Sequence, residues 1–210
     1  MGSKFSISEV CSTSWQRTKA QIWVLSGLII GMSIISFTLG AFAMPIQQSV
    51  MGAIVINLIS CIISCIFALG YMKNIFQALD GEEPQFSAYG QQARKIITYL
   101  VANILMAIIV TLGLCLFIIP GIYLALRLQF YAALIVEDDA GIIESLQRSW
   151  EITRGQEMSL FMLMLAMIGI CILGLILLGI GIFVAMPLIY MMYAYVFRKL
   201  NAPLQILEEV

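Results

Sequence analysis

The stretch Phe117-Ile118-Ile119-Pro120-Gly121-Ile122-Tyr123 lies in the most apolar part of the chain, and Arg127 follows four residues later. Proline cannot continue a helix from its interior, and glycine tolerates the backbone conformations of turns. The stretch therefore predicts a tight turn at Pro120-Gly121. On each side of it lies an apolar segment, 96–119 and 122–136, and we expect the two segments to cross a membrane as a hairpin.

The overall composition agrees with a membrane protein. Of 210 residues, 61% are hydrophobic and 11% are charged, whereas a soluble domain has about 25% charged residues. Several apolar runs reach the roughly 20 residues that a helix needs to cross the ~30 Å hydrocarbon core of a bilayer. We therefore predict an all-α, polytopic membrane helical bundle with six transmembrane helices and amphipathic interfacial helices.

We expect the chain to form a single membrane domain over residues 1–210, built from three hairpins. The predicted segments are an amphipathic helix over 1–21, hairpin 1 over 22–72, a connection over 73–95, hairpin 2 over 96–136, a second amphipathic helix over 137–157, hairpin 3 over 158–200 and a tail over 201–210. A short loop through Gln47 and Gln48 closes hairpin 1, and the Gly179-Ile180-Gly181-Ile182 turn closes hairpin 3.

The distribution of basic residues predicts the orientation. Ten of the eleven Lys and Arg residues fall in the N-terminal segment, the 73–95 connection, the 137–157 segment and the C-terminal segment. With six spans these four regions lie on one side of the membrane. The positive-inside rule then places both termini in the cytoplasm.

Composition and spacing also exclude several function classes. The chain has no His, which is the commonest metal ligand and general base, and its net charge of -1 gives no basic field for nucleic acid. We predict no catalytic residues, no metal, no cofactor and no nucleic-acid partner, and the chain is not expected to be an enzyme. The run Glu137-Asp138-Asp139 could hold a hard cation, although such a run more commonly forms a solvated helix end.

Arg127 is the one basic residue within a predicted span. Its burial costs about 2.5–3.5 kcal/mol on insertion scales, so a partner is expected. No acidic residue falls within a predicted span, which excludes a carboxylate partner at the same depth. An anionic lipid phosphate is one possible partner, and snorkelling to the outer interface is the alternative. The candidate residues for a ligand or an anionic lipid are Arg127, Asn57, Thr111, Gln129 and Tyr123.

The two amphipathic helices resemble each other. Residues 9–21 and 144–156 match at Glu9/Glu144, Ser14/Ser149, Trp15/Trp150, Thr18/Thr153 and Gln21/Gln156. Duplication and chance both remain open as the origin of these matches. A duplicated unit would consist of one amphipathic helix and one hairpin, repeated in parallel, with the middle hairpin as a diverged copy. The predicted interfacial residues are Trp15, Arg17, Lys19, Trp150, Arg148 and Arg154.

A family resemblance rests on several of these motifs. They are residues 117–123, Arg127, 135–138, 144–150 and 154–155, followed by a Gly-x-Gly turn and a Pro-containing last span. Over about residues 75–200 the chain resembles bacterial six-helix inner-membrane proteins of unknown function of the YciC type. It also resembles the membrane domain of some glycerophosphodiester phosphodiesterases. The resemblance implies a six-helix fold in the bacterial inner (plasma) membrane and no transferable activity.

These observations favour a non-catalytic integral membrane protein that binds or organises lipid or a membrane partner. Its expected partners are membrane lipids and either another membrane protein or further copies of the chain. The alternative is a small transporter or channel subunit, which the suspected internal repeat and the polar residues Asn57, Asn103 and Gln129 favour.

Overall fold

The computed structural model describes residues 5–46, 49–177, 179 and 181–208, with side chains as far as residue 202. All of its regular elements are helical. They are α1 (Ile7–Ala20), α2 (Ile22–Ala43), α3 (Val50–Asp80), α4 (Ser87–Gln92), the 3-10 turn η2 (Ala93–Lys95), α5 (Ile96–Leu116), α6 (Ile118–Leu128), α7 (Tyr131–Glu137), α8 (Ile142–Ile152), α9 (Glu157–Ile176) and α10 (Ile182–Glu208).

Six helical segments in the described part of the chain are long and apolar enough to cross a membrane. They are α2, α3, α4 with α5, α6 with α7, α9, and α10. The predicted all-α fold with six transmembrane segments is therefore confirmed. The two predicted amphipathic helices correspond to α1 and α8, which lie within the predicted segments 1–21 and 137–157.

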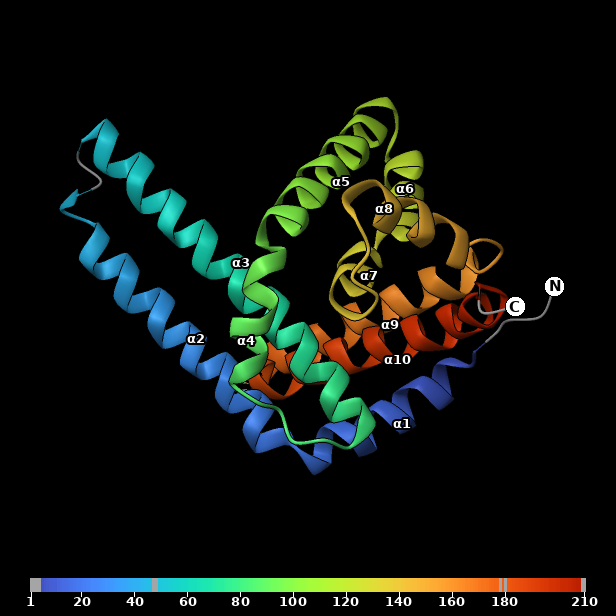
Figure 1. Ribbon diagram of the computed structural model, residues 1–210. Helices are drawn as coiled ribbons and strands as arrows, with labels where there is room; N and C mark the ends of the chain where they lie inside the picture. The colour runs from blue at the N-terminus through green and yellow to red at the C-terminus, as the bar shows by residue number, and fades with distance from the viewer. Residues whose placement is uncertain (1–4, 47–48, 178, 180, 209–210) are drawn as a thin grey trace.

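The hairpin of α2 and α3 and the hairpin of α5 and α6 meet at one end, the convergent end, and diverge at the other. Helices α9 and α10 lie across the convergent end, where Ser26 at the start of α2 donates to the Phe183 carbonyl near the α9–α10 turn. In Figure 1, α2 and α3 extend to the left, α5 and α6 extend upward, and α9 and α10 cross the centre. The convergent end holds the core, where α3, α7 and α10 meet. At this junction Phe76 of α3 packs against Phe197 of α10, with the two ring centroids 5.7 Å apart. Phe130, just before α7, lies 5.8 Å from Phe197.

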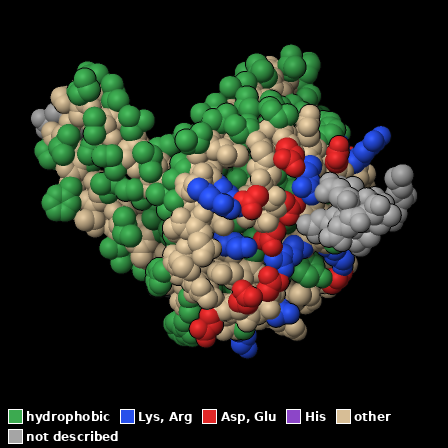
Figure 2. All heavy atoms as spheres, in the orientation of Figure 1, with side chains coloured by type: hydrophobic (Ala, Val, Ile, Leu, Met, Phe, Trp, Pro, Cys, Tyr) green, Lys and Arg blue, Asp and Glu red, His purple; other side chains and the backbone are tan. Residues whose placement is uncertain are grey.

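A wide notch separates the hairpin of α2 and α3 from the hairpin of α5 and α6 (Figure 2), and hydrophobic side chains cover both of its sides. The hairpins bury little of themselves within the chain. In the most apolar 18-residue window of α2 and of α3, only 6% of the residues are buried, compared with 50% in the segment formed by α6 and α7. Most of the first hairpin thus lies exposed, outside the core.

The predicted turn at Pro120-Gly121 is wrong by a few residues. Helix α5 ends at Leu116, and the chain turns at Phe117, whose backbone is extended. Pro120 lies in the first turn of α6, where its missing N–H costs nothing because that N–H has no helical partner. Gly121 instead permits close packing of α5 and α6, since a Cβ there would lie 2.4 Å from the Leu114 side chain.

Several boundaries also differ from the predicted ones. Helix α3 continues to Asp80 instead of ending near residue 72, and α10 continues through the predicted tail to Glu208. The fourth segment is broken between α6 and α7. Gln47 and Gln48 of the predicted first loop, and Ile180 of the predicted third turn, lie outside the described residues. Gly179 in that turn has a φ of 76°, a conformation that favours glycine.

The 73–95 connection is more ordered than the sequence indicated, because α4 packs against α3. The contact is made by Tyr89, whose ring lies directly over Gly70. A Cβ on Gly70 would be 2.3 Å from the Tyr89 ring. The Phe67 ring lies 5.6 Å from that of Tyr89 and extends the contact.

We expect Gly70→Ala to lower the free energy of unfolding by about 1–3 kcal/mol, because the added methyl group overpacks the contact with Tyr89. Equilibrium unfolding in detergent micelles measures the effect. Gly90→Ala on α4 is the matched control, since nothing lies within 4 Å of its Cβ position. Gly70→Ala should cost less stability when it is added to Tyr89→Ala than when it is added to the wild type. Equal costs in the two backgrounds would contradict this account of the contact.

Candidate functional site

The break between α6 and α7 is stabilised by side chains of α8. Ser149 donates its hydroxyl proton to the Arg127 carbonyl over 2.9 Å and accepts the Phe130 N–H over 3.1 Å. The Thr153 hydroxyl lies 3.2 Å from the same carbonyl. A broken helix leaves backbone groups without their usual partners, and buried groups of this kind need replacements. Helix α8 supplies them, so it is part of the protein interior as well as an amphipathic surface helix.

The Arg127 side chain is enclosed at this break and is only 2% exposed. Its Nη1 donates to Glu157 Oε1 over 2.8 Å. The guanidinium carbon lies 4.2 Å from the centre of the Trp150 ring and 5.9 Å from that of Tyr123, distances at which cation–π attraction acts. Glu157 also accepts the Gly155 N–H over 3.1 Å. Arg127 therefore joins the end of α6 to α8 and to the start of α9.

The predicted exclusion of a carboxylate partner for Arg127 is wrong. Glu157 is the first residue of α9, and the sequence places it outside any span. The break after α6 and the packing of α8 against it bring this residue to the level of Arg127. The guanidinium also does not extend to an outer interface, as a snorkelling arginine would, because it is buried among Trp150, Tyr123 and Glu157.

Of the other ligand candidates, Tyr123 lies beside Arg127 and its ring meets Trp150 edge to face at 5.9 Å. Asn57 is exposed on α3, and its Nδ2 donates to the Ala53 carbonyl of the same helix. Thr111 is exposed on α5. Gln129 is half-buried and donates to the Leu126 carbonyl. The structure thus brings together Arg127 and Tyr123, while Asn57 and Thr111 lie on the exposed walls of two different hairpins.

A network of ion pairs, which the sequence did not predict, joins α3, α7 and α10. In each hairpin one of these is the returning helix, which brings the chain back to the convergent end. Arg198 of α10 donates to both oxygens of Asp80 at the end of α3, and to Glu137 at the end of α7 over 2.7 Å. Its guanidinium carbon also lies 5.2 Å from the Phe76 ring centre. Figure 2 shows basic and acidic side chains gathered on one face, below the notch. This face marks the convergent end of the hairpins.

The acidic run Glu137-Asp138-Asp139 belongs to the same network. Glu137 pairs with Arg198, Asp138 with Arg148 over 3.1 Å, and Asp139 with Lys95 over 2.6 Å. Each carboxylate therefore has its own cationic partner. The described residues contain no group of three or more His, Cys, Asp or Glu residues arranged to hold a metal ion.

Comparison with known proteins identifies a family at this point. A family model described as a domain of unknown function, DUF7847, matches residues 86–210, more than half of the chain. The chain belongs to the DUF7847 family. Neither the curated proteins nor the solved structures contain a match to it. The DUF7847 region includes Arg127, Glu157 and the α7 and α10 parts of the ion-pair network, whereas α1, α2 and α3 precede it.

The predicted interfacial residues divide into two groups in this DUF7847 protein. On α1, Trp15 is 44% exposed, and Arg17 and Lys19 are also exposed. On α8, Trp150 is 37% exposed and covers Arg127, and Arg148 is directed toward Asp138. Arg154, after α8, is exposed. Only the α1 residues and Arg154 thus lie free on the surface, as an interfacial role requires.

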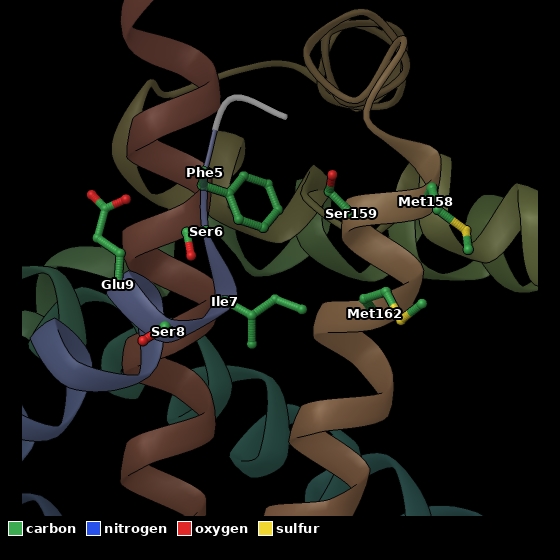
Figure 3. Close-up of a pocket in the computed structure, with 8 residues that line it drawn as sticks. All are labelled: Phe5, Ser6, Ile7, Ser8, Glu9, Met158, Ser159 and Met162. Carbon is green, nitrogen blue, oxygen red and sulfur yellow. The ribbon is translucent and has the colours of Figure 1, made fainter. Parts of the chain in front are cut away.

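One open pocket of about 650 Å³ lies between the start of α1 and the start of α9 (Figure 3). Phe5, Ile7, Met158 and Met162 give it an apolar lining, with serine hydroxyls at its edge. Figure 3 shows the Glu9 carboxylate turned away from the two methionines. Glu9 instead accepts hydrogen bonds from Lys199 and from Tyr195, and the bond from Lys199 lowers the pKa of its carboxyl. Among the described residues that line this pocket, the one charged side chain, Glu9, is therefore already engaged by Lys199 and Tyr195.

Asp139 makes the convergent end sensitive to acid. A hydrogen bond from Lys95 holds the pKa of the Asp139 carboxyl below its usual value. The folded state therefore binds this proton less readily than the unfolded state, so the ion pair stabilises the fold above about pH 4 and is lost as the pH falls below that value.

We expect Asp139→Asn to be less stable than the wild type at pH 7, and the two proteins to converge between about pH 4 and pH 3. Equilibrium unfolding across this pH range tests the expectation. Glu83→Gln, which changes an exposed carboxylate in the loop before α4, is the control. A constant difference between wild type and Asp139→Asn at all pH values would contradict the role of this carboxylate.

Proposed function

We propose that this protein is a non-catalytic integral membrane protein that binds and organises lipid between its hairpins. The observation that carries the proposal is the notch between the hairpin of α2 and α3 and the hairpin of α5 and α6, whose sides are covered by hydrophobic side chains (Figure 2). Within a bilayer a space between mainly apolar walls is filled by lipid chains in preference to water.

The ion pairs support this proposal because they hold the hairpins together at the convergent end. The Arg127–Glu157 pair fixes α6 to α9, and Arg198 ties α10 to α3 and α7. Apolar side chains are exposed on both hairpins, among them Ile54 and Leu58 on α3 and Ile104 and Ile108 on α5, each about half exposed. The spans thus diverge from a fixed base, which leaves their walls open to lipid.

The orientation of the protein forms part of the proposal. The basic residues of the convergent end favour, by the positive-inside rule, an orientation with both termini in the cytoplasm. The resemblance to YciC-type proteins favours the bacterial inner membrane. With this orientation, the charged face in Figure 2 is the cytoplasmic face.

An internal repeat is also proposed, supported by the matched helices. Ser14 and Ser149 are both fully buried, as are Thr18 and Thr153, while Trp15 and Trp150 are both partly exposed. Each short surface helix packs against a returning helix, α1 against α10, α4 against α3 and α8 against α7. Three units of one surface helix and one hairpin, arranged in a ring, account for this pattern.

Native mass spectrometry of the gently extracted protein tests the proposed function. We expect particles that retain phospholipid at activation energies that remove detergent, together with a defined oligomer mass. A closed-notch variant provides the control. Ile54→Cys/Ile108→Cys, joined by bifunctional thiol reagents of increasing length, should retain fewer lipids once the two walls are held together. A particle free of phospholipid in both states would overturn the proposal.

A transporter or channel subunit is the second candidate, favoured by the break between α6 and α7. Discontinuous spans often form the binding sites of transporters. The test is the labelling of single cysteines at Asn57, Asn103 and Gln129 by membrane-impermeant reagents, in a background without the native cysteines. Labelling at these positions would favour transport, whereas protection from both sides would remove this candidate.

A further inference from the structure

An apolar groove runs along α2 on the side covered by α3 and α4. It has a volume of about 480 Å³, and its lining includes Trp23, Gly27, Gly31, Phe67, Phe86 and Tyr89. Gly27 and Gly31 form an open floor, since nothing lies within 4 Å of their Cβ positions. Tyr89 is held in place as a wall by its contact with Gly70. The groove is therefore a fixed feature of the packing of α4 against α3.

The position and length of the groove match one leaflet of a bilayer. Along α2 it extends from Trp23 to Ile35, which at 1.5 Å per residue is about 18 Å. One leaflet contributes about 15 Å of hydrocarbon. Trp23 at one end and Phe86 beside it are 89% and 81% exposed, as aromatic side chains are at a membrane interface. The groove thus begins at the interface on the charged side and ends near the bilayer centre.

The width of the groove can be compared with the widths of a helix and of a hydrocarbon chain. A volume of 480 Å³ spread over about 18 Å gives a cross-section of about 27 Å². A helix about 10 Å in diameter needs about 80 Å². A hydrocarbon chain, whose carbons make contacts at about 4 Å, needs about 20 Å². The groove is therefore wide enough to hold an acyl chain along its length.

Charges of both signs lie near the interfacial end. Gln21 donates to the Glu82 carbonyl over 2.7 Å, which places the loop before α4 beside the α1–α2 junction. Lys19 precedes Trp23 by four residues, and Glu83 precedes Phe86 by three. Both side chains are exposed. A headgroup with one phosphate and one ammonium group is complementary to this pair, whereas a purely anionic headgroup would meet the carboxylates of Glu82 and Glu83.

We infer that this groove is a binding site for a zwitterionic phospholipid of the leaflet on the charged side, with one acyl chain along Gly27 and Gly31. The inference rests on the proposed lipid-organising function and gives it a specific site, separate from the notch. Lys19 contacts the phosphate, and the carboxylates of the loop before α4 contact the ammonium group.

Photolabelling tests the site. The wild-type protein is reconstituted with phosphatidylethanolamine that carries a diazirine in one acyl chain, and adducts are mapped by peptide mass spectrometry. We expect adducts on residues 23–35 and 86–89. Gly31→Leu fills the floor without a clash, and displacing about two methylenes should reduce these adducts about tenfold. Gly40→Leu, at the other open glycine of the same helix, should leave them unchanged.

The outcomes separate this inference from the proposed function, because total bound phospholipid is measured as phosphorus in the same samples. Retained phospholipid with no adducts on the groove, or with equal adducts in Gly31→Leu, would overturn the site and leave the lipid-organising function standing. A protein that retains no phospholipid would overturn both. Equal labelling by a phosphatidylglycerol probe would overturn the zwitterionic assignment.

Discussion

Glu157→Ala is expected to lower the free energy of unfolding by about 3–5 kcal/mol, because it leaves the buried Arg127 guanidinium without its counter-charge. Arg127 is 2% exposed, and its Nη1 lies 2.8 Å from Glu157 Oε1. Equilibrium unfolding in lipid–detergent micelles, followed by circular dichroism and Trp fluorescence, gives the measurement.

The reverse change should cost less. In Arg127→Met the remaining charge is that of Glu157, whose side chain is 33% exposed and can be hydrated. Met also keeps much of the packing against Trp150. The double variant Arg127→Met/Glu157→Leu removes both charges and should recover much of the loss caused by Glu157→Ala. Arg154→Ala, which changes an exposed cation nearby, is the control. Similar losses in all three single variants would show that the pair has no special role.

The six spans were predictable because length and hydropathy alone determine them. A run of about 20 apolar residues has few alternatives to a membrane helix, and α2, α5 and α9 begin and end within a few residues of the predicted limits. The turn at Pro120 was misplaced because proline is disfavoured in a helix interior but well tolerated in a first turn. The sequence pattern alone does not distinguish these two positions.

The partner of Arg127 could not be predicted from the sequence for a different reason. Arg127 and Glu157 are separated by a helix break, α7 and α8, and their contact depends on how α8 packs against α6. One sequence feature could have pointed to this contact. Ser149 and Thr153, on either side of Trp150, carry the hydroxyls that lie against the Arg127 carbonyl. In α1 the corresponding Trp15 is free on the surface, while in α8 the same residue type covers a buried cation. Similar sequences thus lie in different environments.

Neighbouring residues at the convergent end also have different roles that composition does not reveal. Arg94 and Lys95 are the last two residues of the predicted 73–95 connection. Arg94 is 74% exposed and pairs with Asp139 over 3.2 Å. The Lys95 side chain is only 9% exposed and pairs with the same carboxylate. Its Nζ also donates to the Ile135 and Val136 carbonyls over 2.8 and 3.0 Å, so it caps the last turn of α7.

Lys95→Met is therefore expected to lower the free energy of unfolding by about 2–4 kcal/mol. Met has a similar length and keeps the apolar packing, but it leaves two carbonyls at the end of α7 without a donor. Hydrogen bonds to a charged group contribute about 1.5–3 kcal/mol each, and their losses here are not additive. Hydrogen exchange should also increase at the amides of α7, because its C-terminal turn loses its cap.

Arg94→Met is the matched control, because it removes the adjacent cation from the same carboxylate. Exposed ion pairs contribute about 0–1 kcal/mol, so this variant should stay close to the wild type in both stability and exchange. If the two variants lose similar stability, the attraction to Asp139 is what matters at this end of the bundle. A large difference would instead show that the stabilisation comes from the hydrogen bonds of Lys95 to the end of α7. The position of α7, from which Glu137 pairs with Arg198, would then depend on this side chain from η2.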